Sequence, residues 1–165
     1  MTRTIKQGKH YCTPFPIPKL GDLEVEQCIS FDESCKYNLK TKDQADINKL
    51  CGLSYGYHHY NSDRIGWRYL PDEDVFELLT YSYVNGVRIP SISLGKVKEN
   101  EIFRVEISTI IKNGKRFVVF ELNDVCVAKK YKVSKVWIKY TLGLYFGGNR
   151  TAPHNMKVNY YNKQN

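Results

Sequence analysis

Residues able to recognise a polar ligand are concentrated at positions 55–69, which read YGYHHYNSDRIGWRY. Aromatic rings pack against the apolar face of a sugar ring, whereas imidazole, amide and guanidinium groups hydrogen-bond to its hydroxyl or carboxylate groups. This mixture predicts a carbohydrate site with contacts from His58, His59, Asn61, Arg64 and Arg68. Because neighbouring side chains of a strand face opposite sides, about half of the segment is expected to lie in a tyrosine-rich core instead.

A second polar and aromatic group lies at positions 81–88. Tyr81 and Tyr83 are two residues apart and therefore share one face of a strand, and Arg88 follows them after a turn. With Arg68 these residues are predicted to form a concave patch, which one histidine of residues 58–59 is expected to join. The alternative is that the tyrosine rings fill the core and extend only their hydroxyl groups to the sheet edge.

The segment 144–158, LYFGGNRTAPHNMKV, is typical of a strand, a glycine-rich turn and a second strand. Gly147 and Gly148 permit positive φ, and the tight loop after them can bring His154 to the rim of the same patch. A purely structural loop that closes the fold is the commoner explanation for such a segment. His154 is therefore a further candidate ligand contact, with a structural role as its alternative.

The same side-chain types also suit one class of enzyme, the polysaccharide lyases, in which arginine neutralises a uronate carboxylate while tyrosine or histidine moves protons. Glycoside hydrolysis instead needs two carboxylates about 5–10 Å apart, and the best acidic cluster, at positions 72–77, falls in a predicted turn and strand start. The chain has no nucleophile elbow, P-loop, dinucleotide fingerprint or kinase signature. We therefore assign no catalytic residue and expect no cofactor.

Cysteines and histidines do not match a disulfide framework or a zinc site. The cysteine count is odd and no CxxC pair occurs, so we expect free thiols at Cys12, Cys28, Cys35, Cys51 and Cys126. The four histidines are scattered, and His58 and His59, if they lie on a strand, point to opposite faces. No metal is expected.

The net charge of +8 arises mostly from residues 96–139, which contain eleven Lys or Arg and five Asp or Glu. Such a stretch can attract phosphate, nucleic acid or acidic polysaccharide, but lysines spaced through strands more often form a solvated face or protect a sheet edge. Nucleic acid is a disfavoured partner, because these lysines lack the interleaved aromatic residues of single-strand binders.

The candidate residues must be positioned by strands, because strand signals dominate the chain. Apolar residues alternate over 103–111, an Asn113-Gly114 turn leads into 117–122, and Asn85-Gly86 joins 75–84 to 88–94. Further strands are expected at 23–31, 53–60, 65–69, 125–133, 137–146 and 156–161. This pattern predicts a single all-β domain over residues 1–165, an antiparallel β-sandwich or jelly roll, with a closed barrel as the rival architecture.

Two segments depart from the strand pattern. Residues 42–50 predict one short helix, which Asp43 can cap. Residues 1–20 are expected to form an extended N-terminal arm, since each of the prolines at 14, 16 and 18 disfavours helix before it. No apolar run approaches the roughly 18 residues that cross a bilayer, and the first residues, MTRTIKQGKHYC, do not show the apolar stretch of a secretory signal. We therefore expect a soluble protein that is cytoplasmic as synthesised, with no membrane partner.

Two stretches of the sequence resemble a known superfamily. The hairpin at 103–123, with its NGK turn and its apolar return strand, is similar to that of concanavalin A-like lectin/glucanase jelly rolls. YFGGNRTAPHNM resembles the last-strand region of small members from gut Bacteroidetes and their phages. The resemblance implies a two-sheet jelly roll over residues 8–162 with any ligand on the concave sheet. The ExDxE strand of the glucanases and the R-x-E-L, Q-I-H and Y-x-K-x-G-x-Y-x-Q motifs of the alginate lyases are missing, so no catalytic role is implied.

Three functions follow from these observations. The leading hypothesis is a non-enzymatic, lectin-like module that binds a glycan or acidic polysaccharide. The second is a virion or assembly component that contacts other virion proteins, suggested by the extended arm and the phage-like resemblance. The third is a polysaccharide lyase acting on an acidic glycan. Whether the protein is an enzyme stays open, with a non-enzymatic role favoured.

Overall fold

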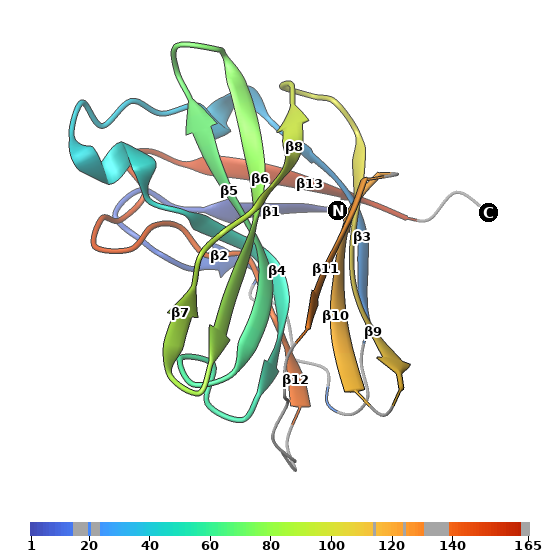
Figure 1. The fold of residues 1–165 in the computed structure, drawn as a ribbon. Helices are drawn as coiled ribbons and strands as arrows, with labels where there is room; N and C mark the ends of the chain where they lie inside the picture. The colour runs from blue at the N-terminus through green and yellow to red at the C-terminus, as the bar shows by residue number, and fades with distance from the viewer. Residues whose placement is uncertain (15–19, 21–23, 114, 124, 131–138, 163–165) are drawn as a thin grey trace.

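The structure is a computed structural model that describes residues 1–14, 20, 24–113, 115–123, 125–130 and 139–162. Two antiparallel β-sheets pack against each other (Figure 1), which confirms the predicted all-β sandwich. The seven-stranded sheet is formed by Thr2–Ile5 (β1), Cys12–Thr13 (β2), Val25–Phe31 (β3), Phe103–Lys112 (β9), Lys115–Leu122 (β10), Val125–Lys130 (β11) and Met156–Tyr161 (β13). The six-stranded sheet is formed by Asn48–Tyr55 (β4), Ser62–Leu70 (β5), Val75–Val84 (β6), Val87–Ile89 (β7), Ser93–Val97 (β8) and Lys139–Leu142 (β12).

The centre of the seven-stranded sheet pairs strands from distant parts of the chain, whereas β4 to β7 of the six-stranded sheet pair in the order of the sequence. The seven-stranded sheet has the order β11-β10-β9-β3-β13-β1-β2, so its centre joins strands from both ends of the chain. The other sheet has the order β12-β4-β5-β6-β7, with β8 also paired to β6. Asn85 and Gly86 have φ values of 51° and 78°, as the predicted Asn-Gly hairpin turn requires. Asn113 has φ 51°, whereas Gly114 lies outside the described residues.

Several segments differ from the sequence-based expectation, among them residues 42–50, 88–94 and 1–20. The expected helix at 42–50 is reduced to a single 3-10 turn, Lys42–Ala45, and residues 48–50 belong to β4. The expected strand at 88–94 is two strands, β7 and β8. The expected arm at 1–20 contains β1, which pairs with β13 and buries Ile5 completely. Long-range strand pairing outweighs local propensity in the first and third cases.

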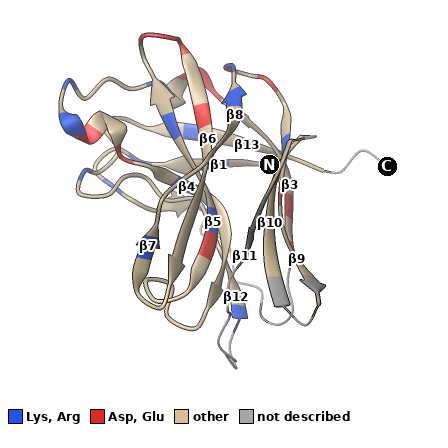
Figure 2. Ribbon diagram, in the orientation of Figure 1, with Lys and Arg blue, Asp and Glu red and all other residues tan. Residues whose placement is uncertain are grey.

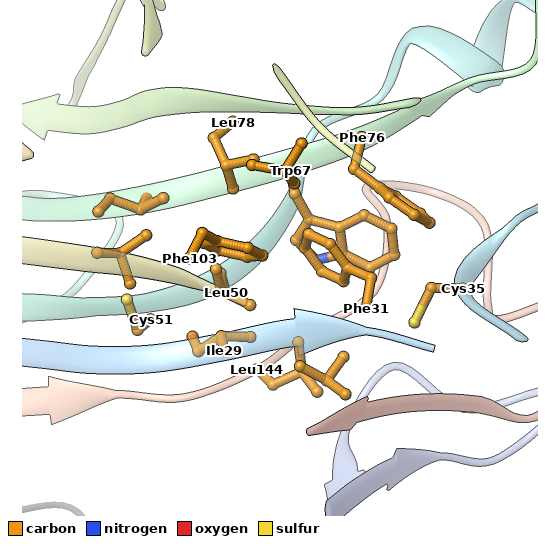
Figure 3. Close-up of a cluster of buried hydrophobic side chains, with 14 of the residues drawn as sticks. Ile29, Phe31, Cys35, Leu50, Cys51, Trp67, Phe76, Leu78, Phe103 and Leu144 are labelled. Carbon is orange, nitrogen blue, oxygen red and sulfur yellow. The ribbon is translucent and has the colours of Figure 1, made fainter. Parts of the chain in front are cut away.

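Aromatic rings from both sheets form the centre of the core (Figure 3). Phe31 of β3 packs against Trp67 of β5 and Phe76 of β6, with ring centroids 4.8 and 4.5 Å apart. Complete burial of a phenylalanine stabilises a fold by about 1.5–3 kcal/mol. Because Ile65 and Trp67 point into this core, the alternation along β5 turns Arg64 to the outer face of the sheet.

All five cysteines are free, as predicted. Cys12, Cys35 and Cys51 are buried, whereas Cys126 on β11 is exposed. Burial raises the pKa of Cys51 to about 12, and burial likewise raises the pKa of Cys35. These two thiols are therefore poor nucleophiles and act as small apolar side chains.

Charged residues of both signs are interspersed over the two sheets (Figure 2). Within the basic stretch 96–139, Lys96 pairs with Glu73, and Arg104 lies among three glutamates. The structure does not describe the side chains of seven of its basic residues, namely Lys112, Lys115, Arg116, Lys129, Lys130, Lys132 and Lys135. The described part of the stretch is thus partly neutralised.

Arg104 is the cation that balances a row of carboxylates on the seven-stranded sheet. Glu26, Glu106 and Glu121 are directly opposite one another on β3, β9 and β10. The Arg104 guanidinium is 3.0 Å from Glu106 and 3.9 Å from Glu26, and it also donates to Glu121. Like charges directly opposite on neighbouring strands destabilise a sheet, so this arginine is needed for the three strands to pair without repulsion.

Arg104→Gln is therefore expected to destabilise the fold by about 1–2 kcal/mol at low salt, from several exposed pairs of a few tenths to one kcal/mol each. Thermal unfolding monitored by circular dichroism measures the change. Added salt is expected to reduce the difference, because it screens the three carboxylates. Lys96→Gln, which loses one exposed partner, is the control and should change stability little. Equal effects of the two substitutions would contradict the role given to Arg104.

Candidate functional site

A pocket of about 490 Å³ opens on the outer face of the six-stranded sheet. Its floor comes from β4, β5 and β6, one end from the loop between β4 and β5, and one wall from the segment that follows β12. Side chains of many types line it, namely those of Tyr11, Lys49, His58, His59, Arg64, Tyr81, Tyr83, Tyr140, Thr141, Leu142, Leu144, Tyr145 and Asn149. None of these described lining residues carries a carboxylate.

Strand register places the floor residues in one row. Arg64 on β5 lies opposite Gly52 on β4 and opposite Tyr81 on β6. A Cβ atom at Gly52 would lie 2.5 Å from Cγ of Arg64, so only glycine leaves space for the arginine stem to cross β4. Tyr83, two residues beyond Tyr81, extends the row on the same face, as parity predicted.

The wall of the pocket is attached to β4 by two consecutive side chains. The backbone of Lys49 exchanges two hydrogen bonds of 2.8 Å with Tyr145. The Gly147 N–H donates to Oδ1 of Asn48 at 2.5 Å, and Nζ of Lys49 donates to the Gly147 carbonyl at 2.8 Å. Nδ2 of the buried Asn48 in turn donates to the hydroxyl of Tyr37 at 2.9 Å. Gly147 has φ 78°, so the positive φ that the sequence predicted for this turn is confirmed at this residue.

Tyr11 brings the N-terminal segment to the same wall. Tyr11 and Tyr145 form an isolated antiparallel β-bridge through their backbones. Their rings meet edge-to-face, with centroids 5.1 Å apart. His10 stacks on Tyr145 at 5.0 Å and donates from Nδ1 to the Phe146 carbonyl. The Tyr11 side chain is 61% exposed, so its ring offers a flat apolar surface at the pocket rim.

Two cations lie at the base of the pocket. Lys49 is only 7% exposed, and its ammonium lies 4.7 Å from the ring centroid of Tyr81 and 5.5 Å from that of Tyr145. Burial lowers the pKa of Lys49, although Tyr81 opposes this, and the positive charge of Arg64 lowers it further. Burial also lowers the pKa of Arg64, whose Nε has no hydrogen-bond partner among the described residues.

Tyr81 lies between these cations and Arg88. The guanidinium carbon of Arg88 is 3.5 Å from the Tyr81 ring centroid, and its Nη2 donates to Ser91. Burial alone would raise the pKa of Tyr81, but the charges of Lys49 and Arg88 outweigh it and lower that pKa. Burial and the neighbouring Tyr81 raise the pKa of Tyr83. The two tyrosines therefore differ in acidity although they share one face of a strand.

His58 and His59 both line the pocket, which corrects the expectation that they point to opposite faces. That expectation assumed a strand over 53–60, but β4 ends at Tyr55 and the histidines lie in the following turn. Their ring centroids are 4.3 Å apart, and His59 meets Tyr83 edge-to-face at 5.7 Å. Among the described residues, no three His, Cys, Asp or Glu side chains are arranged to hold a metal ion.

Three predicted contacts lie away from this pocket. Arg68 pairs with Glu77 on the adjacent strand, with both Nε and Nη2 at 2.8 Å from the carboxylate. Asn61 is buried, and its Oδ1 accepts the backbone N–H of Asn85. His154 donates from Nε2 to the Ser34 carbonyl, on another part of the molecule. The structure thus gathers His58, His59, Arg64, Tyr81 and Tyr83 at the pocket, and Arg88 against Tyr81.

Several pocket residues escaped the sequence interpretation. Lys49 lay in the expected helix, although the pair Asn48-Lys49 between the apolar residues Ile47 and Leu50 was a usable signal. Tyr140 and Tyr145 belonged to the strand expected at 137–146, where no group of polar side chains indicated a binding site. Tyr11 belonged to the expected arm. Their approach to β4 depends on pairings between distant segments.

Comparisons with protein-family models and with curated protein sequences found no match to this chain. In the described part of the chain, no helix has the length and apolar character needed to cross a membrane.

Asn48→Ala is expected to destabilise the protein by about 2–4 kcal/mol, because it leaves the buried Gly147 N–H without its acceptor and removes one hydrogen bond of the Tyr37 hydroxyl. Chemical denaturation measures this loss. The control is Asn159→Ala, which removes an exposed hydrogen bond to Thr2 and should cost within about 0.5 kcal/mol. A small effect at Asn48 would show that the wall does not depend on it.

The pKa of His58 reports the electrostatics of the pocket. Burial, then the charges of Arg64 and His59, lower it below the ordinary value of 6.5. Arg64→Gln is expected to raise the pKa of His58, measured by NMR titration of the ring protons with His154 as internal reference. Because the unfolded chain takes up this proton more readily, stability falls as pH drops from 6.5 to the lowered folded pKa. That loss should be smaller in Arg64→Gln, and an unchanged titration would contradict the placement of Arg64.

Proposed function

We propose that the pocket binds a carbohydrate chain and that the protein is a non-enzymatic, lectin-like module. The observation that supports this most directly is the combination of aromatic rings and hydrogen-bonding cations around one open cavity. Tyrosine rings offer apolar faces to a sugar, and Lys49, Arg64 and the two histidines offer donors to its oxygen atoms. The volume of about 490 Å³ lies in the usual range of ligand sites.

The shape of the site supports a chain rather than a single sugar. A second hollow of about 250 Å³ shares Lys49, Tyr81 and Gly148 with the pocket and continues past them to Asp46 and Arg88. The two hollows adjoin each other at these shared residues and together form a groove on the outer face of the six-stranded sheet. A linear oligosaccharide can therefore contact both hollows at once. The resemblance of 103–123 and 145–156 to concanavalin A-like jelly rolls agrees with this proposal.

A polysaccharide lyase is the second candidate, and Tyr81 is the observation that favours it. The charges of Lys49 and Arg88 lower the pKa of this tyrosine against the effect of burial, which is the direction that a general base requires. A cation beside the base is also what neutralises the carboxylate of a uronate before proton removal. A glycoside hydrolase is disfavoured, because the described lining of the pocket has no pair of carboxylates.

A glycan array scored for binding, followed by incubation of each bound glycan with the protein, separates the two candidates. The lectin-like proposal predicts retention without product. A lyase releases unsaturated sugars by β-elimination, and this activity should disappear in Tyr81→Phe. Absence of any bound glycan would contradict both.

The exposed tyrosines provide a matched pair of variants. Tyr11→Ala is expected to weaken glycan binding about 2- to 12-fold, from the loss of roughly 0.5–1.5 kcal/mol of ring packing. Tyr161→Ala is the control, because Tyr161 is 43% exposed and lies on β13 of the other sheet, where it does not line the pocket. Isothermal titration with the best array ligand measures both. Equal effects of the two substitutions would place the glycan elsewhere on the surface.

A further inference from the structure

We infer that the pocket holds an oxyanion of its ligand, the carboxylate or sulfate group of an acidic sugar, between Lys49 and Arg64. This inference rests on the proposed function and deepens it, because it names the chemical group that the base of the pocket selects. The remainder of the sugar would contact the tyrosine rings above the two cations.

The first support is that both cations lack an acidic partner. Neither Lys49 nor Arg64 forms an ion pair within the described part of the chain, whereas Arg68, Lys96 and Arg104 all do. The Lys49 ammonium donates a hydrogen bond of 2.8 Å to a neutral carbonyl, that of Gly147, and also interacts with the Tyr81 side chain, but with no carboxylate of the described residues in an ion pair. Nε of Arg64 is buried and has no partner among the described residues. Buried cations are normally paired, so an external anion is the missing partner.

The second support is that the surroundings of the two cations do not replace that anion. The rings near Lys49 belong to Tyr81 and Tyr145. Tyr81 partly favours the charged form of Lys49, but this effect is smaller than that of burial, and the pKa of Lys49 stays lowered. Asp46 lines the second hollow, and its attraction is among the smaller influences on Lys49, well below the effect of burial. The positive charge of Arg64 itself lowers the pKa of Lys49. An oxyanion between them would relieve this repulsion.

The third support is that the fold fixes both side chains at the site. Gly52 lets the Arg64 stem lie flat across β4, since a Cβ there would lie 2.5 Å from Cγ of Arg64. The carbonyl of Gly147 holds the Lys49 ammonium in the pocket at 2.8 Å. The two cations are therefore positioned before ligand arrives, and ordering them costs little on binding.

The position of the cations also indicates which sugar of a chain is charged. Lys49 lines both hollows, so a group bound to it lies near the middle of the groove. Asp46 lines only the second hollow, where it would repel a second negative charge. The ligand expected is therefore an oligosaccharide with its acidic residue at an internal position, and with hydroxyl groups facing Asp46.

Inorganic sulfate tests the oxyanion site without any sugar. Thermal unfolding is followed in sodium sulfate and in sodium chloride at equal ionic strength. Sulfate is expected to raise the melting temperature of the wild type more than chloride does, because a ligand that binds the folded state stabilises it. Arg64→Gln and Lys49→Met should bind sulfate about 10- to 100-fold more weakly. Lys6→Met, an exposed lysine outside the pocket, is the control and should behave as the wild type.

Arg64→Gln is expected to fold, since replacing an uncompensated buried cation by a neutral side chain is often neutral or stabilising. Lys49→Met also removes the bond to the Gly147 carbonyl and is expected to be less stable, so Arg64→Gln is the decisive variant. The melting temperatures of both variants in salt-free buffer check this directly. The inference fails if sulfate and chloride stabilise the wild type equally, or if the variants keep the full sulfate effect.

A short oligosaccharide with a single internal uronate and the neutral methyl ester of that uronate test the sugar part. The acid is expected to bind at least about tenfold more tightly than the ester, and this preference should disappear in Arg64→Gln. Equal binding of acid and ester, unchanged in Arg64→Gln, overturns the oxyanion inference but leaves carbohydrate binding intact. Specific sulfate binding with no glycan bound on the array supports the oxyanion site and overturns the carbohydrate proposal.

Discussion

The buried amide of Asn48 is the interaction on which the rest of the site depends. It accepts the Gly147 N–H and donates to the Tyr37 hydroxyl, so one side chain joins β4, the segment after β12 and the loop before β4. Lys49, the next residue, bonds to the carbonyl of the same glycine. Because buried polar groups are costly when unpaired, these bonds determine where the C-terminal segment crosses the sheet. The pocket exists between that segment and the outer face of β4 to β6.

This arrangement has an electrostatic consequence. The backbone geometry that pairs Tyr145 with Lys49 also draws the lysine side chain out of water and toward two tyrosine rings. Arg64 reaches the same region across Gly52. Desolvated cations are expensive for a fold, and a protein that keeps them commonly uses them. Burial and the charge of Arg64 lower the pKa of Lys49, and the charges of Lys49 and Arg88 lower the pKa of Tyr81 against the effect of burial. The raised pKa of Tyr83 instead follows from burial and from the neighbouring Tyr81.

Arg64 and Arg68 show what the alternation of side chains along a strand predicts and what it does not predict. Both arginines lie on β5, four residues apart, and both face away from Trp67. Arg68 meets Glu77 across the strand pair and is neutralised there, whereas the partner of Arg64 at the equivalent position on β6 is Tyr81. The sequence interpretation placed both in one groove, since period-two alternation gives the face of a side chain but not its neighbours.

The amino-acid sequence by itself determined the all-β class, the Asn85-Gly86 turn, β6 and β13 with their bounds, and the free thiols. These features depend on local alternation, turn chemistry and composition, which a single segment carries. Tertiary structure decided that residues 48–50 form a strand, that His58 and His59 share a pocket, and that Lys49 lies at its base. The histidines share the pocket because β4 ends at Tyr55 and they lie in the turn that follows. The placement of residues 48–50 and of Lys49 depends on contacts between distant segments, such as Asn48 with Gly147, whose free energy no local pattern contains.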